Sequence, residues 1–234
     1  MTDYPTRATE SFFGRRKAQK LGGRKQRLMD EVLPLLRLDP QADSPTDISP
    51  LFKTKGRRIH LEIGFGGGEH LATQADTFRD INFIGIEPFI NGMAKMLGEI
   101  DDRGLENIRL YDDDATQILD WLPDNCLDQI DLLYPDPWPK RRNWKRRFVN
   151  QKNLARISRV LKPEGFFRFA SDIDTYVNWT LQHISQQNHL QWSAQTAGDW
   201  RNPWQRWHRT RYEAKAIREG RAPCYLVFKN CRDK

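Results

Sequence analysis

The chain has 234 residues, 38% of them hydrophobic, with a formal net charge of +7 and an isoelectric point near 9.4. This length allows one sizeable core, and no apolar run reaches the ~20 residues of a membrane helix or the apolar stretch of a secretory signal. The three cysteines have no CxxC or Cys/His spacing. We therefore expect a cytoplasmic protein without a metal site or disulfide framework, and its basic charge favours an anionic partner.

The first 50 residues differ in composition from the rest of the chain. Residues 1–27 contain eight Lys or Arg against two acids, with glycines between them, which predicts a mobile basic arm. A short amphipathic helix is expected over 27–38, and the Pro-, Ser- and Asp-rich stretch 40–50 is typical of a linker. We therefore divide the chain into an arm, short helix and linker (1–50) and a main domain (51–234).

Short apolar runs alternate with helical patterns through the main domain. This alternation predicts βαβ units, with a mostly parallel sheet and helices on both faces. Two later runs, 190–194 and 224–230, predict an antiparallel strand pair beside that sheet. The five expected parallel strands are 59–65, 82–87, 107–112, 128–134 and 165–171, and the main expected helices are 69–78, 89–100, 148–161 and 174–187.

A glycine-rich turn follows the first expected strand, where the sequence reads EIGFGGGE. Glycines such as Gly64 and Gly66 let a backbone turn tightly and approach a ligand. Glu87 ends the next expected strand, a position from which a carboxylate accepts hydrogen bonds from ribose hydroxyls. The pair favours a nucleoside-bearing ligand over a purely structural turn.

Acidic residues around this turn indicate which nucleoside cofactor it holds. Glu62 and Glu69 flank the glycines, where they would repel the pyrophosphate of a dinucleotide but suit the sulfonium and ammonium groups of S-adenosylmethionine. Asp114 follows the third strand, where it either meets an adenine amino group or caps the helix after it. Spacing alone leaves both roles of Asp114 open.

The stretch YPDPWP, residues 134–139, ends the fourth expected strand, at the edge where open α/β sheets bind ligands. Its three prolines stiffen the turn and hold Asp136 still. We predict a catalytic role for Asp136, with a plain turn residue as the alternative.

Cations follow this turn without an intervening acid. Together with the N-terminal arm and the segment 201–221, which interleaves Arg with Trp and Tyr, they make three basic clusters. Cations neutralise phosphates and aromatic rings stack on unpaired bases, so the clusters indicate a folded RNA or DNA substrate. A solvated surface is the alternative for any one of them. The cluster after Asp136 comprises Lys140, Arg141, Arg142, Lys145, Arg146 and Arg147.

These motifs together resemble the bacterial tRNA (guanine-N7-)-methyltransferases over nearly the whole chain. The resemblance rests on SFFGRRKAQKL, LEIGFGGGEHL, FIGIEPF, YDDDA, PDPWPK followed by KRR, SDIDTY and TRYE. It implies a class I methyltransferase fold, related to the Rossmann fold, and the variable-loop guanine of tRNA as target. It also implies S-adenosylmethionine contacts from Glu62, Glu87, Asp114 and Asp136, and guanosine contacts from Lys140, Asp172 and the segment Thr210–Glu213.

The chain departs from this family pattern at Tyr134, Asn143 and Ser171, where the family commonly has Phe, His and Thr. Asn143 argues against proton transfer at that site, and none is needed, because guanine N7 carries a lone pair and no proton. Asp172 has helix capping as its alternative role. Two other functions stay open, a nicotinamide-dependent oxidoreductase and a non-catalytic RNA-binding protein. We predict no obligatory protein partner.

Overall fold

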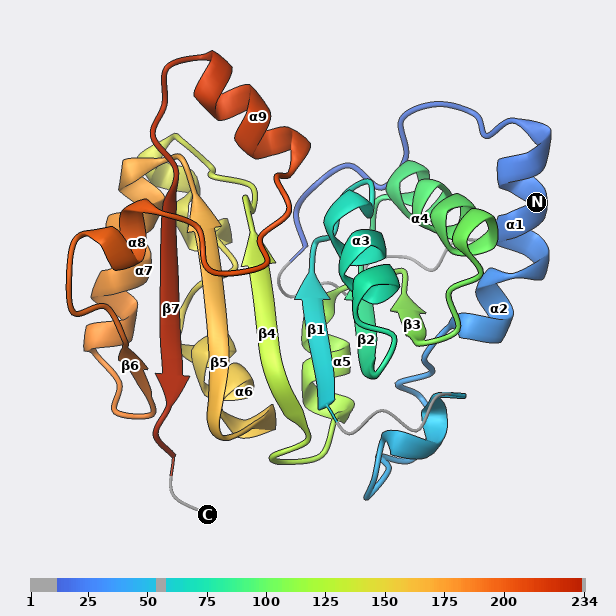
Figure 1. Cartoon of the computed structure of the whole chain (residues 1–234), viewed down its shortest axis with the longest axis horizontal. Coiled ribbons are helices and arrows are strands. Elements are labelled where there is room, and N and C mark those ends of the chain that lie inside the picture. The colour runs from blue at the N-terminus through green and yellow to red at the C-terminus, as the bar shows by residue number, and fades with distance from the viewer. Residues whose placement is uncertain (1–11, 54–57, 233–234) are drawn as a thin grey trace.

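The computed structural model describes residues 12–53 and 58–232, and one seven-stranded sheet forms its centre (Figure 1). The strand order is β3-β2-β1-β4-β5-β7-β6, parallel from β3 to β5, with β7 antiparallel to both β5 and β6. This confirms the expected mostly parallel sheet and antiparallel pair. The strands are β1 Arg58–Ile63, β2 Ile81–Ile86, β3 Ile108–Tyr111, β4 Leu127–Leu133, β5 Leu161–Ser171, β6 Leu190–Trp192 and β7 Cys224–Asn230.

Helices cover both faces of this sheet, as expected. In Figure 1, α3 and α4 lie in front of β1 and β2, whereas α5 and α6 lie behind the sheet. The helices are α1 Gly23–Glu31, α2 Leu33–Leu36, α3 Glu69–Thr77, α4 Ile90–Arg103, α5 Ala115–Trp121, α6 Gln151–Val160, α7 Asp174–Ser185, α8 Gly198–Arg201 and α9 Arg211–Arg218, and the 3-10 turns are η1 Ser49–Leu51 and η2 Arg141–Arg146.

The α4 helix illustrates how the sequence pattern produces these layers. Met93, Leu97 and Ile100 recur at helical spacing and are buried against the sheet side. The helix ends at Gly104, whose φ of 59° lies in the left-handed region that glycine adopts without strain. Every residue of β2 is buried, because helices cover both of its faces.

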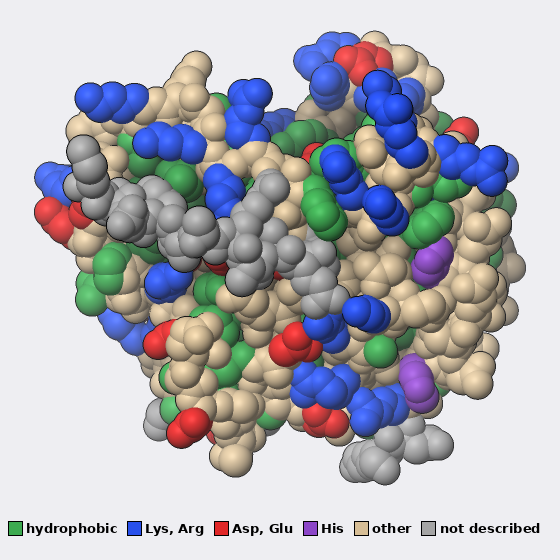
Figure 2. All heavy atoms as spheres, turned by 180° about the vertical axis from the view of Figure 1, so that it is seen from behind, with side chains coloured by type: hydrophobic (Ala, Val, Ile, Leu, Met, Phe, Trp, Pro, Cys, Tyr) green, Lys and Arg blue, Asp and Glu red, His purple; other side chains and the backbone are tan. Residues whose placement is uncertain are grey.

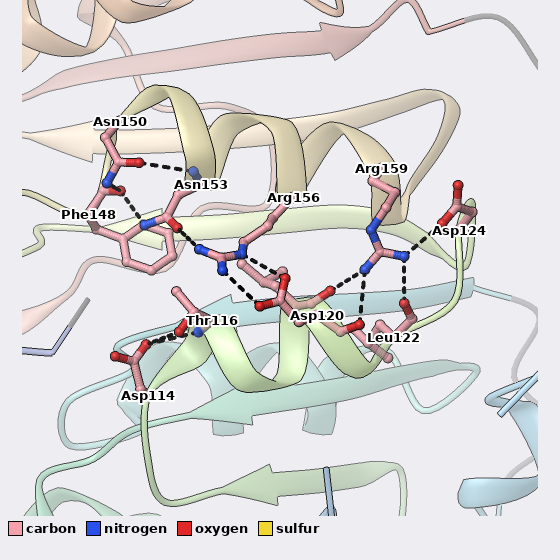
Figure 3. Close-up of polar contacts among 11 residues, drawn as sticks. Asp114, Thr116, Asp120, Leu122, Asp124, Phe148, Asn150, Asn153, Arg156 and Arg159 are labelled. Carbon is pink, nitrogen blue, oxygen red and sulfur yellow. Dashed lines mark hydrogen bonds and ion pairs between the residues drawn. The ribbon is translucent and has the colours of Figure 1, made fainter. Parts of the chain in front are cut away.

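Behind the sheet, ion pairs join α5 to α6, and a side chain caps the start of each helix (Figure 3). Asp114 caps α5 by accepting a hydrogen bond from a backbone N–H, and Asn150 caps α6 in the same way. Arg156 donates two hydrogen bonds to Asp120, at 2.7 and 2.8 Å, and Arg159 pairs with the loop after α5. Of the two roles left open for Asp114, helix capping is observed in the structure.

Residues 12–22 differ from the mobile arm that their composition predicts. The Arg16 carbonyl accepts a hydrogen bond of 2.8 Å from the N–H of Ile90, and the Ala18 N–H donates to the Asn91 side chain at 2.9 Å. Backbone contacts with the start of α4 therefore hold this segment in place. Residues 1–11 of the expected arm lie outside the described residues.

The amphipathic segment expected over 27–38 forms two helices and begins earlier, at Gly23. Pro34, which has no N–H to donate, lies in the first turn of α2, and Val32 separates the two helices. The expected linker contains no helix or strand before η1, and the expected domain boundary falls partly in 54–57, outside the described residues.

The segment between β6 and β7 contains two helices, α8 and α9, that we did not predict. Thr210 caps α9, since its hydroxyl accepts a hydrogen bond of 3.1 Å from the Glu213 N–H. The spacing T-x-x-E is the sequence signature of such a helix start and would have located it.

Candidate active site

A cavity of about 340 Å³ opens at the carboxyl ends of β1, β2 and β4. This is the edge at which parallel α/β sheets bind ligands, because their loops converge there. Five of the predicted site residues line it: Gly64, Gly66, Glu87, Asp136 and Arg146.

The glycine turn after β1 forms one wall of this cavity. Gly64, Gly66 and Gly68 have φ values of 72°, 60° and 81°, in the left-handed region where a side chain is strained. Gly68 is the N-cap of α3. The turn bends the chain from strand to helix and leaves its backbone free of Cβ atoms at the cavity.

Glu87 directly follows β2 and is held by the glycine turn. Its carboxylate accepts hydrogen bonds from the N–H groups of Gly66, at 2.6 Å, and Phe89, at 2.9 Å. The pKa of Glu87 is raised to about 7, mainly because the carboxyl is buried. The two backbone donors lower this pKa, whereas the nearby Asp136 contributes to raising it. The carboxyl is therefore poised to change charge near neutral pH.

Glu62 lies deeper than we expected, below the cavity wall. It is buried, and His70 of α3 contacts its carboxylate at 2.8 Å through Nδ1. Glu69, the other flanking acid, pairs with Lys95 and lies 3.9 Å from Arg211. Both flanking carboxylates thus have basic partners, and the carboxylates that line the cavity are those of Glu87 and Asp136, with Arg15 and Arg146 beside them.

Asp114 lines a small adjoining pocket of about 60 Å³, next to Ala115. One carboxylate oxygen binds the Thr116 N–H and hydroxyl, each at 2.9 Å. The other accepts a hydrogen bond of 3.0 Å from the Phe12 N–H. The N-terminal segment therefore contacts the residue that the sequence associates with adenine.

Asp136 lies exposed at the cavity rim, on a turn that strain and proline both restrict. Tyr134 and Trp138 on either side have positive φ values of 49° and 45°, which non-glycine residues rarely adopt. The Asp136 carboxyl makes no hydrogen bond or ion pair with a described residue, and desolvation raises its pKa. It is a rigidly placed acceptor without a protein partner in the described part of the chain.

The predicted substrate residues Lys140, Asp172, Thr210 and Glu213 do not line the cavity, and they differ in exposure and in their partners. Lys140 is exposed, whereas Asp172 forms an ion pair with Arg221 and does not cap α7, whose N-cap is Ile173. Glu213 is buried. Its two oxygens accept hydrogen bonds of 2.6 Å from the Trp207 ring N–H and the Tyr225 hydroxyl. The sequence did not predict either partner.

The cations after Asp136 divide into three groups. Lys140, Arg141, Arg142 and Lys145 are exposed on or beside η2. Arg146 is partly buried, with its guanidinium 4.9 Å from the ring centre of Trp138.

Arg147 corrects our expectation, because it is 1% exposed and points inward. It donates to the Pro137 carbonyl at 2.9 Å and to the Thr175 carbonyl and hydroxyl at 2.7 and 3.0 Å. Its charge is therefore unavailable to RNA phosphates in this structure, and it holds the Asp136 turn instead.

Two aromatic residues that the sequence reasoning missed, Phe12 and Phe13, also line the cavity and come from the N-terminal segment. Tyr212, which belongs to the predicted substrate segment Thr210–Glu213, lines it from α9 and is 44% exposed. Phe13 packs edge-on against Trp138 with ring centres 6.3 Å apart. The adjacent aromatics in SFFGRR, unusual in an arm this basic, were the available signal.

Among the described residues, no group of three or more His, Cys, Asp or Glu side chains is arranged to hold a metal ion. No helix in the same part of the chain is long and apolar enough to cross a membrane.

Comparison with solved structures shows the class of fold. The 16S rRNA methyltransferase KamB superposes with a TM-score of 0.52 at 14% identity, covering 75% of this chain and 88% of that one. A putative methyltransferase from Streptococcus mutans, solved in complex with SAH, gives 0.51 at 10% identity, covering 87% and 98%. With the site at the carboxyl ends of its parallel strands, this is the class I methyltransferase fold.

Sequence comparison defines the family. A family model described as "Putative methyltransferase" matches residues 56–226. The tRNA (guanine-N(7)-)-methyltransferases of Rhizobium meliloti and Agrobacterium fabrum are each 57% identical over 95% of this chain and 96% of their own length. The chain belongs to the tRNA (guanine-N(7)-)-methyltransferase family.

Proposed function

We propose that the protein transfers a methyl group from S-adenosylmethionine to N7 of a guanine in tRNA, with the variable-loop guanine as target. The observation that carries the proposal is a cavity at the carboxyl ends of the strands that presents the Glu87 and Asp136 carboxylates, directly beside an exposed rim of Lys and Arg on η2. The names of the curated relatives support the same activity.

The cavity residues fit S-adenosylmethionine, which supplies a methyl group on a positively charged sulfonium when bound. Ionised Glu87 accepts hydrogen bonds from the ribose, and Gly64 and Gly66 leave room beside it. Asp136 contributes a second carboxylate that favours a cationic ligand. We place the adenine near Asp114, where its amino group must share or replace the Phe12 N–H. Glu62 is buried beneath the cavity and acts on the cofactor from there, with its carboxylate oriented by His70.

Methyl transfer to guanine N7 is an in-line displacement, so alignment of the nucleophile, methyl and sulfur is the main task of the site. Asp136 accepts hydrogen bonds from guanine N1–H and N2–H₂ and offsets the positive charge that the purine gains. Glu213 reaches the base only by exchanging a bond to Trp207 or Tyr225. Thr210, Asp172 and Lys140 complete the proposed guanosine contacts.

The tRNA surface we propose runs along the edge of the molecule toward which β1 and β4 point. Figure 2 shows many Lys and Arg side chains along this upper edge. We assign phosphate contacts to Arg141, Arg142, Lys145 and Arg146, and leave Arg147 out because it is buried. A tRNA substrate also places the protein in the cytoplasm.

The two other functions have less support. The curated relatives are methyltransferases, not oxidoreductases. A nicotinamide dinucleotide would place its pyrophosphate at the first turn of α3, which Glu69 occupies. A non-catalytic RNA-binding protein would leave the Glu87 and Asp136 carboxylates without a role.

The decisive experiment incubates the protein with unmodified tRNA and S-adenosylmethionine labelled with tritium in its methyl group. We expect label in tRNA, recovered as 7-methylguanosine after nuclease digestion. Transcripts that carry adenine in place of the variable-loop guanine are the control. Absence of label, or label in another nucleoside, would reject the proposal.

Cofactor affinity should depend on pH through Glu87. Its pKa of about 7 lies above the ordinary value of 4.5, so below pH 7 the free protein holds the neutral acid, which accepts ribose hydrogen bonds poorly. We expect S-adenosylhomocysteine to bind roughly tenfold more tightly at pH 8 than at pH 6 in calorimetric titrations. Glu87→Gln should bind weakly with a flatter profile. An equally flat wild-type profile would contradict the role of Glu87.

Affinity for tRNA should fall steeply with salt, because each phosphate contact releases condensed counterions. For Arg141→Ala/Arg142→Ala we expect weaker tRNA binding and a log K against log [salt] slope smaller in magnitude by about one to two. Affinity for S-adenosylhomocysteine should be unchanged. Lys53 is an exposed cation that lies beyond η1, and Lys53→Ala is the control for loss of a cation elsewhere on the surface. A wild-type slope in the double variant would make this cluster an ordinary solvated surface.

A further inference from the structure

A second cavity, of about 400 Å³, lies at the opposite end of the sheet from the active site. We call it the amino-end cavity, because it is lined by Arg58 and His60 from the start of β1, by the starts of β4 and β5, and by Arg206 in the loop after α8. Its size is in the range of small-molecule sites. It shares no lining residue with the active-site cavity.

Cations outnumber acids around the amino-end cavity, and the acids have partners. Asp128 accepts a hydrogen bond of 2.8 Å from Lys162, and Glu164 pairs with Lys229. Arg58 lies 3.8 Å from Asp80. Two guanidinium groups are left over, those of Arg168 and Arg206, and neither has a hydrogen bond or ion pair with another side chain in the described part of the chain.

Arg168 of β5 is the more unusual of the two. Its Nε is buried without a hydrogen-bond partner, and its guanidinium lies 5.0 Å from the ring centre of Trp204. Desolvation lowers the pKa of Arg168, although the neighbouring Asp131 opposes this. Asp131 is itself buried and accepts both of its side-chain hydrogen bonds from Gln129. A buried donor without an acceptor is destabilising, and because Arg168 also lines the cavity, the remaining N–H groups of its guanidinium are available to a ligand there.

Arg206 reaches the same cavity from a pinned loop. Its backbone has a φ of 64°, and its carbonyl accepts a hydrogen bond of 3.0 Å from the Gln74 side chain. Its guanidinium lies 5.0 Å from the ring centre of Phe78. The side chain is thus held at the cavity while its donors stay unused.

The remaining walls add a neutral polar ring and an apolar surface. Burial lowers the pKa of His60 to about 4, so this imidazole is uncharged at neutral pH and able to hydrogen-bond. Phe166 on β5 is 38% exposed, although aromatic side chains are usually covered. Guanidinium groups bind phosphate oxygens, and an exposed ring suits the face of a base.

We propose that the amino-end cavity binds a phosphate-bearing nucleotide, with Arg168 and Arg206 donating to the phosphate and Phe166 facing the base. The nucleotide comes either from solution or from the RNA substrate. Both sources present the same chemistry to the cavity.

The test titrates adenosine monophosphate into the protein by calorimetry, with S-adenosylhomocysteine at saturation so that the active-site cavity is blocked. We expect one binding site for the nucleotide and much weaker binding of adenosine, which lacks the phosphate. Arg206→Gln and Arg168→Gln should each weaken binding about tenfold or more. Arg206 is a loop residue, so its variant stays informative if Arg168→Gln fails to fold. Lys53→Gln controls for charge and should bind as the wild type does.

Absence of nucleotide binding would overturn the proposal, as would equal binding of adenosine or binding that both arginine variants retain. A competition experiment distinguishes the two sources. If the nucleotide comes from RNA, adenosine monophosphate displaces tRNA and Arg206→Gln weakens tRNA binding. If it comes from solution, both ligands bind together and the variant binds tRNA normally.

Discussion

Replacement of Asp136 by alanine is expected to lower the rate of methyl transfer by about a hundredfold to a thousandfold while the protein stays folded. Asp136 is an exposed residue at the cavity rim and its carboxyl has no partner among the described residues, so its removal breaks no interaction that stabilises the fold. The restrained turn around it presents the carboxylate in one place, and alanine cannot replace its acceptor oxygens. Single-turnover kinetics with tritiated cofactor give the rate, and thermal unfolding reports on the fold.

Asp136→Asn is the matched control, because it keeps the shape and one acceptor oxygen but removes the charge. If charge balance on the methylated purine matters, the methyl-transfer rate of the asparagine variant should be close to that of the alanine variant. If hydrogen-bond acceptance dominates, it should retain intermediate activity. A folded alanine variant with near-normal single-turnover rates would end the assignment of Asp136 as the catalytic residue.

Replacement of Arg147 by alanine should destabilise the protein by about 3–5 kcal/mol, the range for loss of a buried hydrogen-bond network. The guanidinium satisfies three acceptors and packs 4.5 Å from the ring centre of Trp144 and 4.7 Å from that of Tyr176. One acceptor is the Pro137 carbonyl, next to Asp136. Variants that still fold should therefore also lose activity. Urea unfolding monitored by tryptophan fluorescence measures the free energy.

Arg146→Ala provides the comparison for Arg147, since it removes the same charge one residue earlier. Arg146 lies over Trp138 with part of its side chain exposed, so its loss should change the unfolding free energy by about 1 kcal/mol or less. Its main effect should be on tRNA affinity. Equal unfolding free energies for the two variants would contradict the internal role of Arg147.

The fold was predictable from sequence where a local pattern carried the information. Strands buried on both faces, such as β2, appear as continuous apolar runs, and α4 shows helical spacing with a glycine at its end. Docking of residues 12–22 was not predictable, because it depends on contacts with α4 and Asp114 about 70 to 100 residues away. The α9 helix was not predicted, although Thr210 and Glu213 carry the capping signature.

For the site, sequence located the residues that follow each strand but not the partners of their side chains. Gly66, Glu87 and Asp136 meet because parallel strands end at one edge, which spacing predicts. Whether a carboxylate has a cation beside it depends on tertiary packing. For that reason the pairing of Glu62 with His70 and the inward direction of Arg147 were found only in the structure.

The position of β7 between β5 and β6 affects how the protein matures during synthesis. Within the described chain β6 pairs only with β7, although it is made about 30 residues earlier, so it waits without a strand partner. Until β7 arrives, the outer edge of β5 is also open to pairing with other chains. Tyr225 of β7 holds Glu213, so this proposed guanosine contact acquires its final geometry only with the last strand. A ribosome that stalls before residue 224 therefore carries a nascent chain with exposed sheet edges and an incomplete site, a candidate for chaperone binding.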